Sequence, residues 1–358
     1  EIGSGLVGSE MCIRDSIMFI TMCVIAYNEE NAIDRILGDI AAQDYNHNDM
    51  EVVLVDGAST DNTKKHLDNF KEKYKDDFRR VVVLDNPKRT LPSGWNVALR
   101  EYKGDAIIKV DAHAEIPKDF VSKNVRVLES GEDICGGQRP VIIDEETPWK
   151  NTLLLAESSM FGSSIAPYRN NPGKTYVKSM FHAAYRRQVF DKVGFFNENL
   201  ARTEDNEIHY RMREAGFKLC FDPDIISYQH IRSSLPKMLK QKYSNGLWIG
   251  KTAKICPQCL SLYHFVPFAF VSAIIMSVIG TGQKICMPLN RLAKKLTKLM
   301  WSAYGLLAAV MSAFSVMKAG KKKNMTNVAL PFLFLLLHVS YGVGTLKGLL
   351  SKTDGERK

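Results

Sequence analysis

The first 110 residues alternate short apolar runs with segments whose apolar residues recur at helical spacing. The uninterrupted runs predict β-strands over residues 20–26, 51–55, 81–84 and 106–110. Helical spacing follows the first run from Tyr27 to Gln43, and Asn28 is the expected N-cap. Strands without polar alternation that are joined by helical crossovers predict an α/β fold with a parallel sheet buried on both faces.

Polar side chains stand where these predicted strands end. Tyr27, Asp56 and Asp111 each follow an apolar run directly. Ligands of open α/β sheets bind beyond the carboxyl ends of the strands. Alternation along a strand also places Asp111 and His113 on one side, so the two predict a shared ligand. A polar turn that only ends a strand is the alternative.

The pattern after residue 180 is more mixed. Helical spacing covers residues 185–194 and 204–216, each followed by a glycine stop, and short strands are expected over 217–221 and 225–229. Glu204 and Asp205 open the second helix. Asp205 is suited to act as a general base, although acids at this position also stabilise a helix start.

Three apolar segments close the chain, over residues 265–280, 299–317 and 328–346. About 20 apolar residues span a bilayer core, so the last two are expected to be transmembrane helices. The first segment is short and contains Pro267. We favour three spans over a re-entrant first segment or buried core helices.

The formal charge of +9 is distributed unevenly. Residues 231–358 hold 19 Lys and Arg against two acids, and these basic residues flank the apolar segments. This arrangement indicates an anionic membrane surface rather than nucleic acid. The seven cysteines are scattered, which favours a reducing compartment, and the lone pair Cys256 and Cys259 has no partner pair to complete a zinc site.

The patterns also divide the chain. The opening stretch "EIGSGLVGSEMCIRDS" has neither periodicity nor a signal-peptide core, so we expect a non-native leader before a start near Met18. We predict a leader over 1–16, a catalytic domain over 17–235, an amphipathic basic segment over 236–262, a transmembrane region over 263–350 and a tail over 351–358.

Several quoted stretches together carry a family likeness. "CVIAYNEE", "VLVDGASTDNT", "GDAIIKVDAHAEIP" and "YRRQVFDKVGFFNENLARTEDNEIHYRMREAGF" resemble family 2 glycosyltransferases of the GT-A fold. The forms "DAHA", "NPKRTLPSGWNVALR" and "FHAAYRR" are most similar to the succinoglycan-biosynthesis glucosyltransferase subgroup. The likeness covers about residues 20–250 and the C-terminal membrane helices.

The resemblance implies a nucleotide-sugar site. In the family, the residues that match Tyr27, Glu29 and Asp56 hold the base of the nucleotide. Tyr27 is suited to stack on uracil, and Asp56 to accept a hydrogen bond from its N3–H. Gly57 stands where many relatives carry a second acid, so it is left out of the expected site.

The resemblance further implies a metal and a base. The family's D-x-D motif matches Asp111, near ribose and phosphate, and His113, on a divalent metal, Mn²⁺ or Mg²⁺. Imidazole in place of the second carboxylate leaves the identity of the metal open. Asp205, beside Glu204, matches the family's catalytic base, and family 2 enzymes invert the anomeric configuration.

Three further residues are weaker candidates for substrate contact. Gln241 lies where processive relatives begin a Q-x-x-R-W motif, but Ser244 and Asn245 replace its Arg and Trp. This departure favours transfer of one sugar or a few over polymerisation. Trp248 is either a sugar-stacking or an interfacial residue, and His182 is either a substrate contact or a buried structural histidine.

The expected function is therefore a membrane-bound transferase that moves a sugar, glucose by preference, from a UDP-sugar to a lipid-linked acceptor. Because UDP-sugars are cytosolic, the catalytic domain is expected on the cytoplasmic side of the membrane. Two alternatives stay open. The first is a polyisoprenyl-phosphate glycosyltransferase, and the second is a catalytically impaired membrane scaffold of the same fold.

Overall fold

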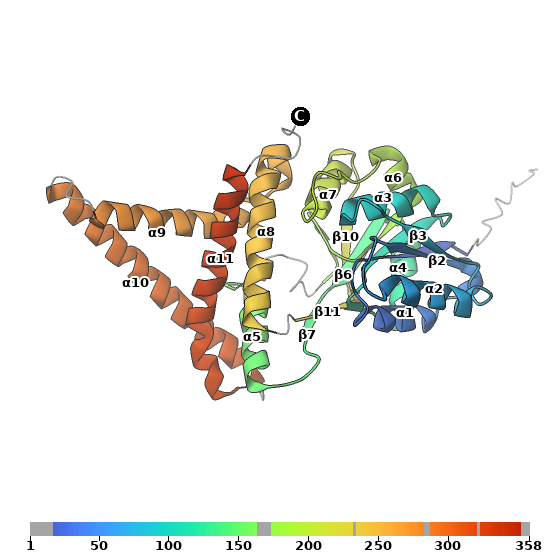
Figure 1. Cartoon of the computed structure of the whole chain (residues 1–358), viewed down its shortest axis with the longest axis horizontal. Coiled ribbons are helices and arrows are strands. Elements are labelled where there is room, and N and C mark those ends of the chain that lie inside the picture. Colours follow the sequence, from blue (N-terminus) through green and yellow to red (C-terminus); the bar gives the residue numbers. More distant parts are fainter. Residues whose placement is uncertain (1–16, 163–172, 232–233, 283–286, 321–322, 352–358) are drawn as a thin grey trace, which may run out of the picture.

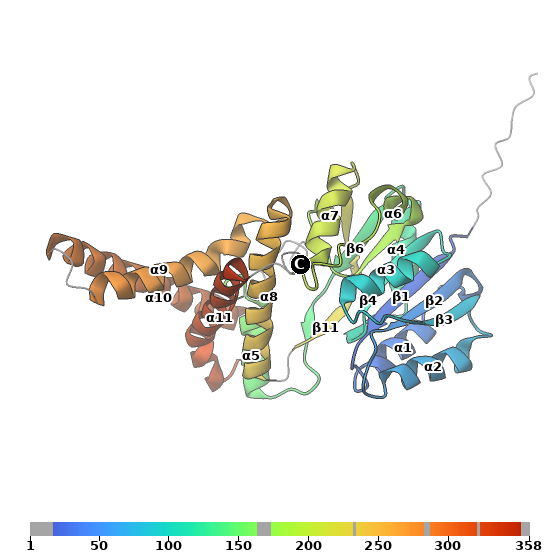
Figure 2. The ribbon, with the colours of Figure 1, turned by 45° about the horizontal axis from the view of Figure 1, so that its top comes forward.

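The computed structural model describes residues 17–162, 173–231, 234–282, 287–320 and 323–351. It has two parts, an α/β part built around a large sheet and a part made of long helices (Figure 1). Helix α8 lies between them in the two ribbon views (Figures 1 and 2).

The large sheet has eight strands in the order β3-β2-β1-β4-β9-β6-β10-β8. Its first four strands are parallel and confirm the four predicted apolar runs: β1 Ile20–Ala26, β2 Met50–Asp56, β3 Arg80–Asp85 and β4 Ala106–Asp111. Strand β9 (Ala183–Arg186) runs antiparallel between β4 and β6, and β6 pairs parallel with β10. The remaining strands are β6 Ile134–Gln138, β8 Thr175–Val177 and β10 Leu219–Ile226.

Helices cover both faces of this sheet, as the uninterrupted apolar runs predict. On one face, alternate residues of β1 and β2 pack with α1 (Ile33–Ala41), α2 (Thr63–Tyr74) and α4 (Phe120–Glu129). On the other face, the intervening residues pack with three more helices: α3 Leu91–Glu101, α6 Arg187–Val193 and α7 Glu204–Glu214. The chain has the GT-A fold: a mostly parallel central sheet flanked by helices.

Three details of the local predictions were wrong. Strands were expected over 217–221 and 225–229, but β10 runs without a break over Leu219–Ile226 and the next strand covers Tyr228–His230. Asn28 is not the N-cap of α1, which begins only at Ile33. Instead Asn28 has a positive φ of 55° and its Oδ1 accepts a hydrogen bond from the Thr60 N–H at 2.8 Å. The predicted helix over 185–194 begins at Arg187, because Tyr185 and Arg186 end β9.

A small second sheet lies beside the carboxyl end of β4. Strand β11 (Tyr228–His230) pairs antiparallel with β5 (Ala114–Glu115) and parallel with β7 (Val141–Ile142). Since β5 follows β4 after two residues, this sheet fixes the turn that carries His113.

Within the described residues, the helical part contains three helices that are long and apolar enough to cross a membrane. The candidate spans are Leu262–Thr281, Asn290–Lys318 and Met325–Leu350. They centre on α9 (Val266–Gly282), α10 (Met287–Lys318) and α11 (Leu330–Leu350). Pro267 is the second residue of α9, where its missing N–H breaks no helical hydrogen bond, so it does not interrupt the segment as the re-entrant alternative required.

Helix α8 (Leu235–Ile255) packs along α11 through glycines on both helices (Figure 1). A Cβ at Gly246 would lie 2.0 Å from the Tyr341 carbonyl oxygen, and one at Gly344 would lie 2.1 Å from the Tyr243 carbonyl oxygen. Gly250 and Gly348 repeat the contact one turn further on. Two small-x-x-x-small stripes therefore bring the two backbones into direct contact, as in closely packed membrane helices.

Helix α5 (Pro148–Ser158) comes from the α/β part of the sequence but packs on the helical part. Its Leu153 and Ala156 lie in one apolar cluster with Met238 of α8 and Phe334 of α11. The Lys242 ammonium lies 2.8 Å from the Glu157 carboxylate between α8 and α5. The division of the chain at residue 235 stays a prediction.

Candidate active site

The carboxyl edge of the large sheet brings two predicted site residues to the strands on either side of β1. Ala26 of β1 pairs with Asp56 of β2, and Ile25 of β1 pairs with Asp111 of β4. The two aspartates therefore flank the end of β1, and Tyr27 follows that strand between them. This is the arrangement that the sequence predicts.

Asp56 is buried, with 2% of its surface exposed, and only one of its carboxylate oxygens has a hydrogen bond among the described residues. Oδ2 accepts from the Ser59 N–H at 3.2 Å, whereas Oδ1 has no such partner. Tyr27 is 46% exposed beside it, and a Cβ on Gly57 would come within 3.1 Å of the Tyr27 Cβ. An acceptor atom next to an exposed aromatic ring suits a flat ring with an N–H edge.

Glu29 and His113 lie together at the same edge. The Glu29 Oε1 is 3.1 Å from the His113 Nδ1, and both side chains are about one third exposed, at 29% and 33%. The Glu29 backbone N–H donates to the Thr63 hydroxyl at 2.8 Å, which fixes the loop after β1.

Asp111 is surrounded by basic groups. Its Oδ2 lies 3.2 Å from the His182 Nε2 and 3.4 Å from the Arg139 Nη1. Burial opposes ionisation of Asp111, but His182, His113 and Arg139 outweigh it and hold its pKa well below its usual value. The carboxylate therefore stays charged at neutral pH.

His182 is the residue before β9. Its side chain is buried, and its ring is directed at Asp111. Its Nδ1 lies 2.8 Å from the Ser227 hydroxyl, so both ring nitrogens have polar partners. Burial lowers the pKa of His182, against the attraction of Asp111. Because both ring nitrogens have partners, the ring is fixed and orients the Asp111 carboxylate.

Asp205 is paired with a residue that the sequence analysis missed. Lys109, on β4 two residues before Asp111, is 3% exposed and its Nζ contacts the Asp205 Oδ1. The ammonium also lies 5.1 Å from the centre of the Trp95 ring. Burial opposes the charge of Lys109, but Asp205 and Glu204 outweigh it and raise its pKa. Burial raises the pKa of Asp205, and Lys109 limits that rise.

Glu204 lies deeper than Asp205. It is 3% exposed, and its Oε2 is buried with no hydrogen-bond partner among the described residues. Burial, with the neighbouring Asp205 charge, raises the pKa of Glu204 to about 8. The residue before it, Thr203, bonds through its hydroxyl to Thr252 of α8, which ties the start of α7 to the helical part.

The structure does not join the remaining candidates to this cluster. Gln241 lines a small pocket between α8 and β11 with His230 and Met238. The Trp248 ring lies 4.4 Å from the Lys251 Nζ on the same helix. Neither side chain has a hydrogen bond or ring contact to Asp111 or Asp205 within the described ranges.

Lys109 could have been noticed from the sequence, whereas Arg139 could not. A lysine inside the apolar run "AIIKV" must be buried on a central strand, and buried lysines are almost always paired. Arg139 follows the strand over Ile134–Gln138 in "GGQRP", but nothing in its spacing points to Asp111. Only the fold reveals that partner.

The side chains of the site suit a divalent metal, but they do not by themselves form a complete set of metal ligands. No cluster of three or more His, Cys, Asp or Glu side chains able to hold a metal occurs among the described residues. Asp111 and His113 supply one carboxylate and one imidazole, a set that Mn²⁺ accepts when phosphate oxygens complete the coordination.

Comparison with known proteins relates this chain to a family. Residues 21–194 match the model described as Glycosyl transferase family 2. Over these residues the chain is similar to this family, and Asp56 and Asp111 lie inside the matched region.

Two curated relatives extend the likeness. A dolichyl N-acetyl-α-D-glucosaminyl phosphate 3-β-D-2,3-diacetamido-2,3-dideoxy-β-D-glucuronosyltransferase of Methanococcus voltae is 26% identical over 340 residues, 93% of this chain and 97% of that protein. The succinoglycan biosynthesis protein ExoA of Rhizobium meliloti is 26% identical over 201 residues, 54% of this chain and 58% of that protein.

A solved structure confirms the fold. The mannosyltransferase PcManGT of Pyrobaculum calidifontis, in complex with GDP-Man and Mn²⁺, has a TM-score of 0.57 to this chain. The alignment covers 92% of this chain and 87% of the other at 18% identity, and it includes the C-terminal helices.

Proposed function

We propose that this chain is an inverting, membrane-bound family 2 glycosyltransferase that transfers a sugar, glucose by preference, from a UDP-sugar to a lipid-linked saccharide. The observation that carries the proposal is the contact of Asp205 with buried Lys109, two residues from Asp111 on one strand. It supports a candidate base on α7 held beside a candidate diphosphate site on β4.

The donor half of the proposal uses Tyr27, Asp56 and Asp111. Uracil would stack on Tyr27 and donate its N3–H to the Asp56 Oδ1 that has no partner among the described residues. Asp111 and His113 would hold Mn²⁺ or Mg²⁺, which supplies charge neutralisation to the departing diphosphate when it is bound. Arg139 adds a fixed positive charge beside Asp111.

The acceptor half uses Asp205. Its carboxylate takes the proton of an acceptor hydroxyl while that oxygen bonds to the anomeric carbon, and the bond to the UDP oxygen breaks. Lys109 favours the ionised carboxylate at neutral pH, which a proton acceptor requires. A single displacement inverts the anomeric centre and needs no enzyme nucleophile.

The proposed class of acceptor is supported by the helical part of this chain and by the Methanococcus relative, which matches it over nearly the whole length of both proteins. The Methanococcus protein is named for a dolichyl-phosphate-linked sugar, and its match covers 93% of this chain, which also has three candidate spans among its described residues. This supports a lipid-linked sugar over a bare polyisoprenyl phosphate as the acceptor.

The test is product analysis. The purified chain in nanodiscs is incubated with a panel of UDP-sugars and a lipid-linked sugar phosphate, with and without Mn²⁺, and the lipid product is measured by mass spectrometry. A product one hexose heavier that survives mild acid treatment at the new bond supports the proposal. An acid-labile sugar phosphate would instead identify a polyisoprenyl-phosphate transferase, and no turnover of any donor would favour the scaffold.

We further propose three spans, with the catalytic domain on the cytoplasmic side. Exposed Lys294, Lys295 and Lys298 alternate with exposed Leu292 and Leu296 in the first turns of α10, as expected of a helix end in the outer membrane interface. An Asn290→Cys variant without other cysteines, treated with an impermeant thiol reagent on intact cells, tests this. Labelling supports three spans, and protection until permeabilisation contradicts them.

A further inference from the structure

A second polar pocket lies between α7 and the segment that leads into α9. About 390 Å³ of space lies within its outline, and that volume includes open solvent. Asn206 and Arg213, two turns apart on one face of α7, form one wall. Lys178 and Ser179, which follow β8, line it as well, together with the segment from Gln258 to His264, except Leu262, at the start of the first candidate span.

The pocket is lined by hydrogen-bond donors, and none of its described lining residues is an acid. Lys178 and Arg213 supply two positive charges. The Arg213 Nε is buried and has no hydrogen-bond partner among the described residues. One N–H group of its guanidinium can therefore still donate a hydrogen bond. Two cations with spare donors are the chemistry that recognises a phosphate.

Apolar surface adjoins the pocket on its membrane side. The first candidate span begins at Leu262, next to lining residues Ser261 and Tyr263. Leu262 is 90% exposed and Val266 is 63% exposed, although both are large apolar residues. A ligand with a phosphate in the pocket and an apolar tail along α9 would cover both kinds of surface.

The start of α7 links the pocket to the candidate base along the chain. Asn206 lines the pocket, and Asp205 precedes it in the first turn of α7 with its carboxylate turned to Lys109.

Resting on the function proposed above, we propose that this pocket binds the phosphate of the lipid-linked sugar acceptor. Lys178 and Arg213 contact the phosphate, the isoprenoid tail follows Leu262 and Val266, and the first sugar reaches Asp205. The pocket is separate from the donor diphosphate site, which is formed by Asp111, His113 and Arg139 at the end of β4 and beyond β6.

The experiment measures binding of undecaprenyl phosphate and of undecaprenol to the full chain in phosphatidylcholine nanodiscs. Wild type should prefer the phosphate. The double variant Lys178→Ala with Arg213→Ala should bind the phosphate about tenfold more weakly or worse, because two charged hydrogen bonds are lost, and should bind the alcohol as before. The conservative pair Lys178→Arg with Arg213→Lys should retain most of the preference.

A matched control removes two exposed lysines of α2, Lys65→Ala with Lys73→Ala, and should leave the preference unchanged. UDP binding, measured on the same samples, verifies that the variants are folded. Unchanged phosphate binding in the double variant, or equal competition by phosphatidylglycerol, would overturn the proposal. Phosphate-dependent binding without sugar transfer from any donor would support the pocket while contradicting the proposed function.

Discussion

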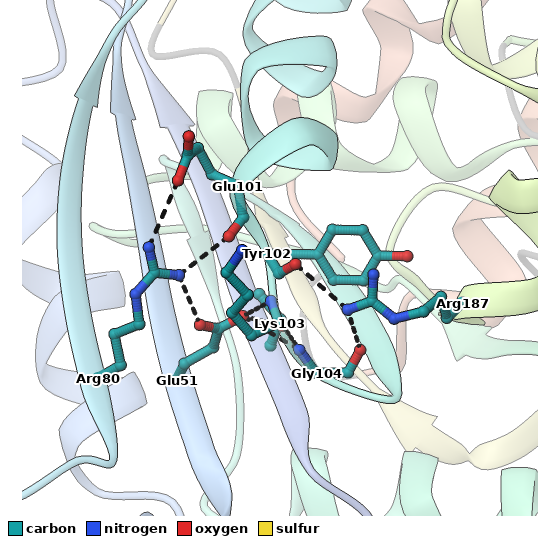
Figure 3. Close-up of polar contacts among 8 residues, drawn as sticks. Glu51, Arg80, Glu101, Tyr102, Lys103, Gly104 and Arg187 are labelled. Carbon is teal, nitrogen blue, oxygen red and sulfur yellow. Dashed lines mark hydrogen bonds and ion pairs between the residues drawn. The ribbon is translucent and has the colours of Figure 1, made fainter.

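Two buried clusters of charge lie at opposite ends of the same parallel strands. At the amino end of β2, Glu51 is fully buried and accepts hydrogen bonds from the Thr21 hydroxyl at 2.6 Å and the Gly104 N–H at 3.2 Å (Figure 3). The Lys103 N–H and the Arg80 guanidinium, at 2.9 Å, complete its partners. At the carboxyl end, Asp56 and Glu204 each keep a buried oxygen without a partner among the described residues.

The difference in hydrogen bonding distinguishes a cluster that stabilises the fold from a cluster that can bind a ligand. Every donor around Glu51 is already used within the fold, and Arg187 seals the same loop by donating to the Tyr102 and Gly104 carbonyls at 3.2 and 2.7 Å (Figure 3). A satisfied carboxylate offers nothing to a ligand. Buried oxygens that lack a partner cost free energy in the empty protein and regain it when a ligand donates to them.

The largest effect is expected when the candidate base at the carboxyl end is removed. Asp205→Asn keeps the shape of the side chain but cannot take a proton, so turnover should fall by about 10²–10⁴ while UDP-sugar affinity is retained. Single-turnover kinetics and donor binding measure the two effects. Glu214→Gln, exposed at the other end of α7, is the matched control. Near wild-type turnover of the Asn variant would assign the base elsewhere.

At the other cluster the expected loss is in stability. Glu51→Gln puts an amide against the Arg80 guanidinium, and leaving one partner of a buried pair uncompensated costs about 3–5 kcal/mol. Thermal unfolding should show this loss, while turnover per folded molecule stays unchanged. Glu101→Gln, whose partly exposed carboxylate lies 3.5 Å from Arg80, should change stability by less than about 1 kcal/mol. Equal melting temperatures for both variants would refute the assignment.

At the carboxyl end, Glu204 should make the stability of the protein depend on pH. Its folded pKa of about 8 lies above the ordinary value of 4.5, so the folded state holds the proton more tightly than the unfolded state. The stabilisation is complete below pH 4.5 and is lost as pH rises toward 8, at up to about 1.4 kcal/mol per pH unit. Glu204→Gln should remove this slope from melting temperatures recorded between pH 5 and 8. The same slope in both proteins would exclude Glu204 as its source.

Lys109 should affect the rate through the pKa of Asp205. In Lys109→Met the counter-charge is lost, so burial raises the pKa of Asp205 further and less carboxylate is ionised at neutral pH. The acidic limb of the pH–rate profile should move to higher pH, with activity about tenfold lower at pH 7 and partly recovered at pH 9. An unmoved limb with a uniformly lower rate would reduce Lys109 to a packing role.

The smallest expected effect concerns the metal. His113→Asp should retain activity and shift preference from Mn²⁺ toward Mg²⁺ by a few-fold, because a carboxylate oxygen suits Mg²⁺ better than imidazole does. Asp111→Ala should instead weaken metal-dependent donor binding. Metal titrations of turnover compare the three proteins. Identical preferences before and after the His113 change would count against His113 as a ligand.

The strand runs and the carboxyl-edge residues were predictable from sequence because both depend on local order. An apolar run reports a buried strand, and β1 then brings Asp56 and Asp111 together by parallel register alone. The partners of these acids were not predictable. Arg139 and Lys109 reach Asp111 and Asp205 from separate elements, and only the packing of α7 and β9 on β4 sets those distances.

The direct contact of α8 and α11 affects where the candidate base lies. At Gly246 the contact leaves no room for a side chain between the two helices, and the Thr252 hydroxyl of α8 bonds to the hydroxyl of Thr203, which precedes α7. In the membrane-bound arrangement proposed above, this contact would fix the distance between Asp205 and the bilayer. Under the proposed function, an acceptor with a longer saccharide would carry its terminal hydroxyl past the Asp205 carboxylate, so the length of the attached glycan would become a condition for the next addition.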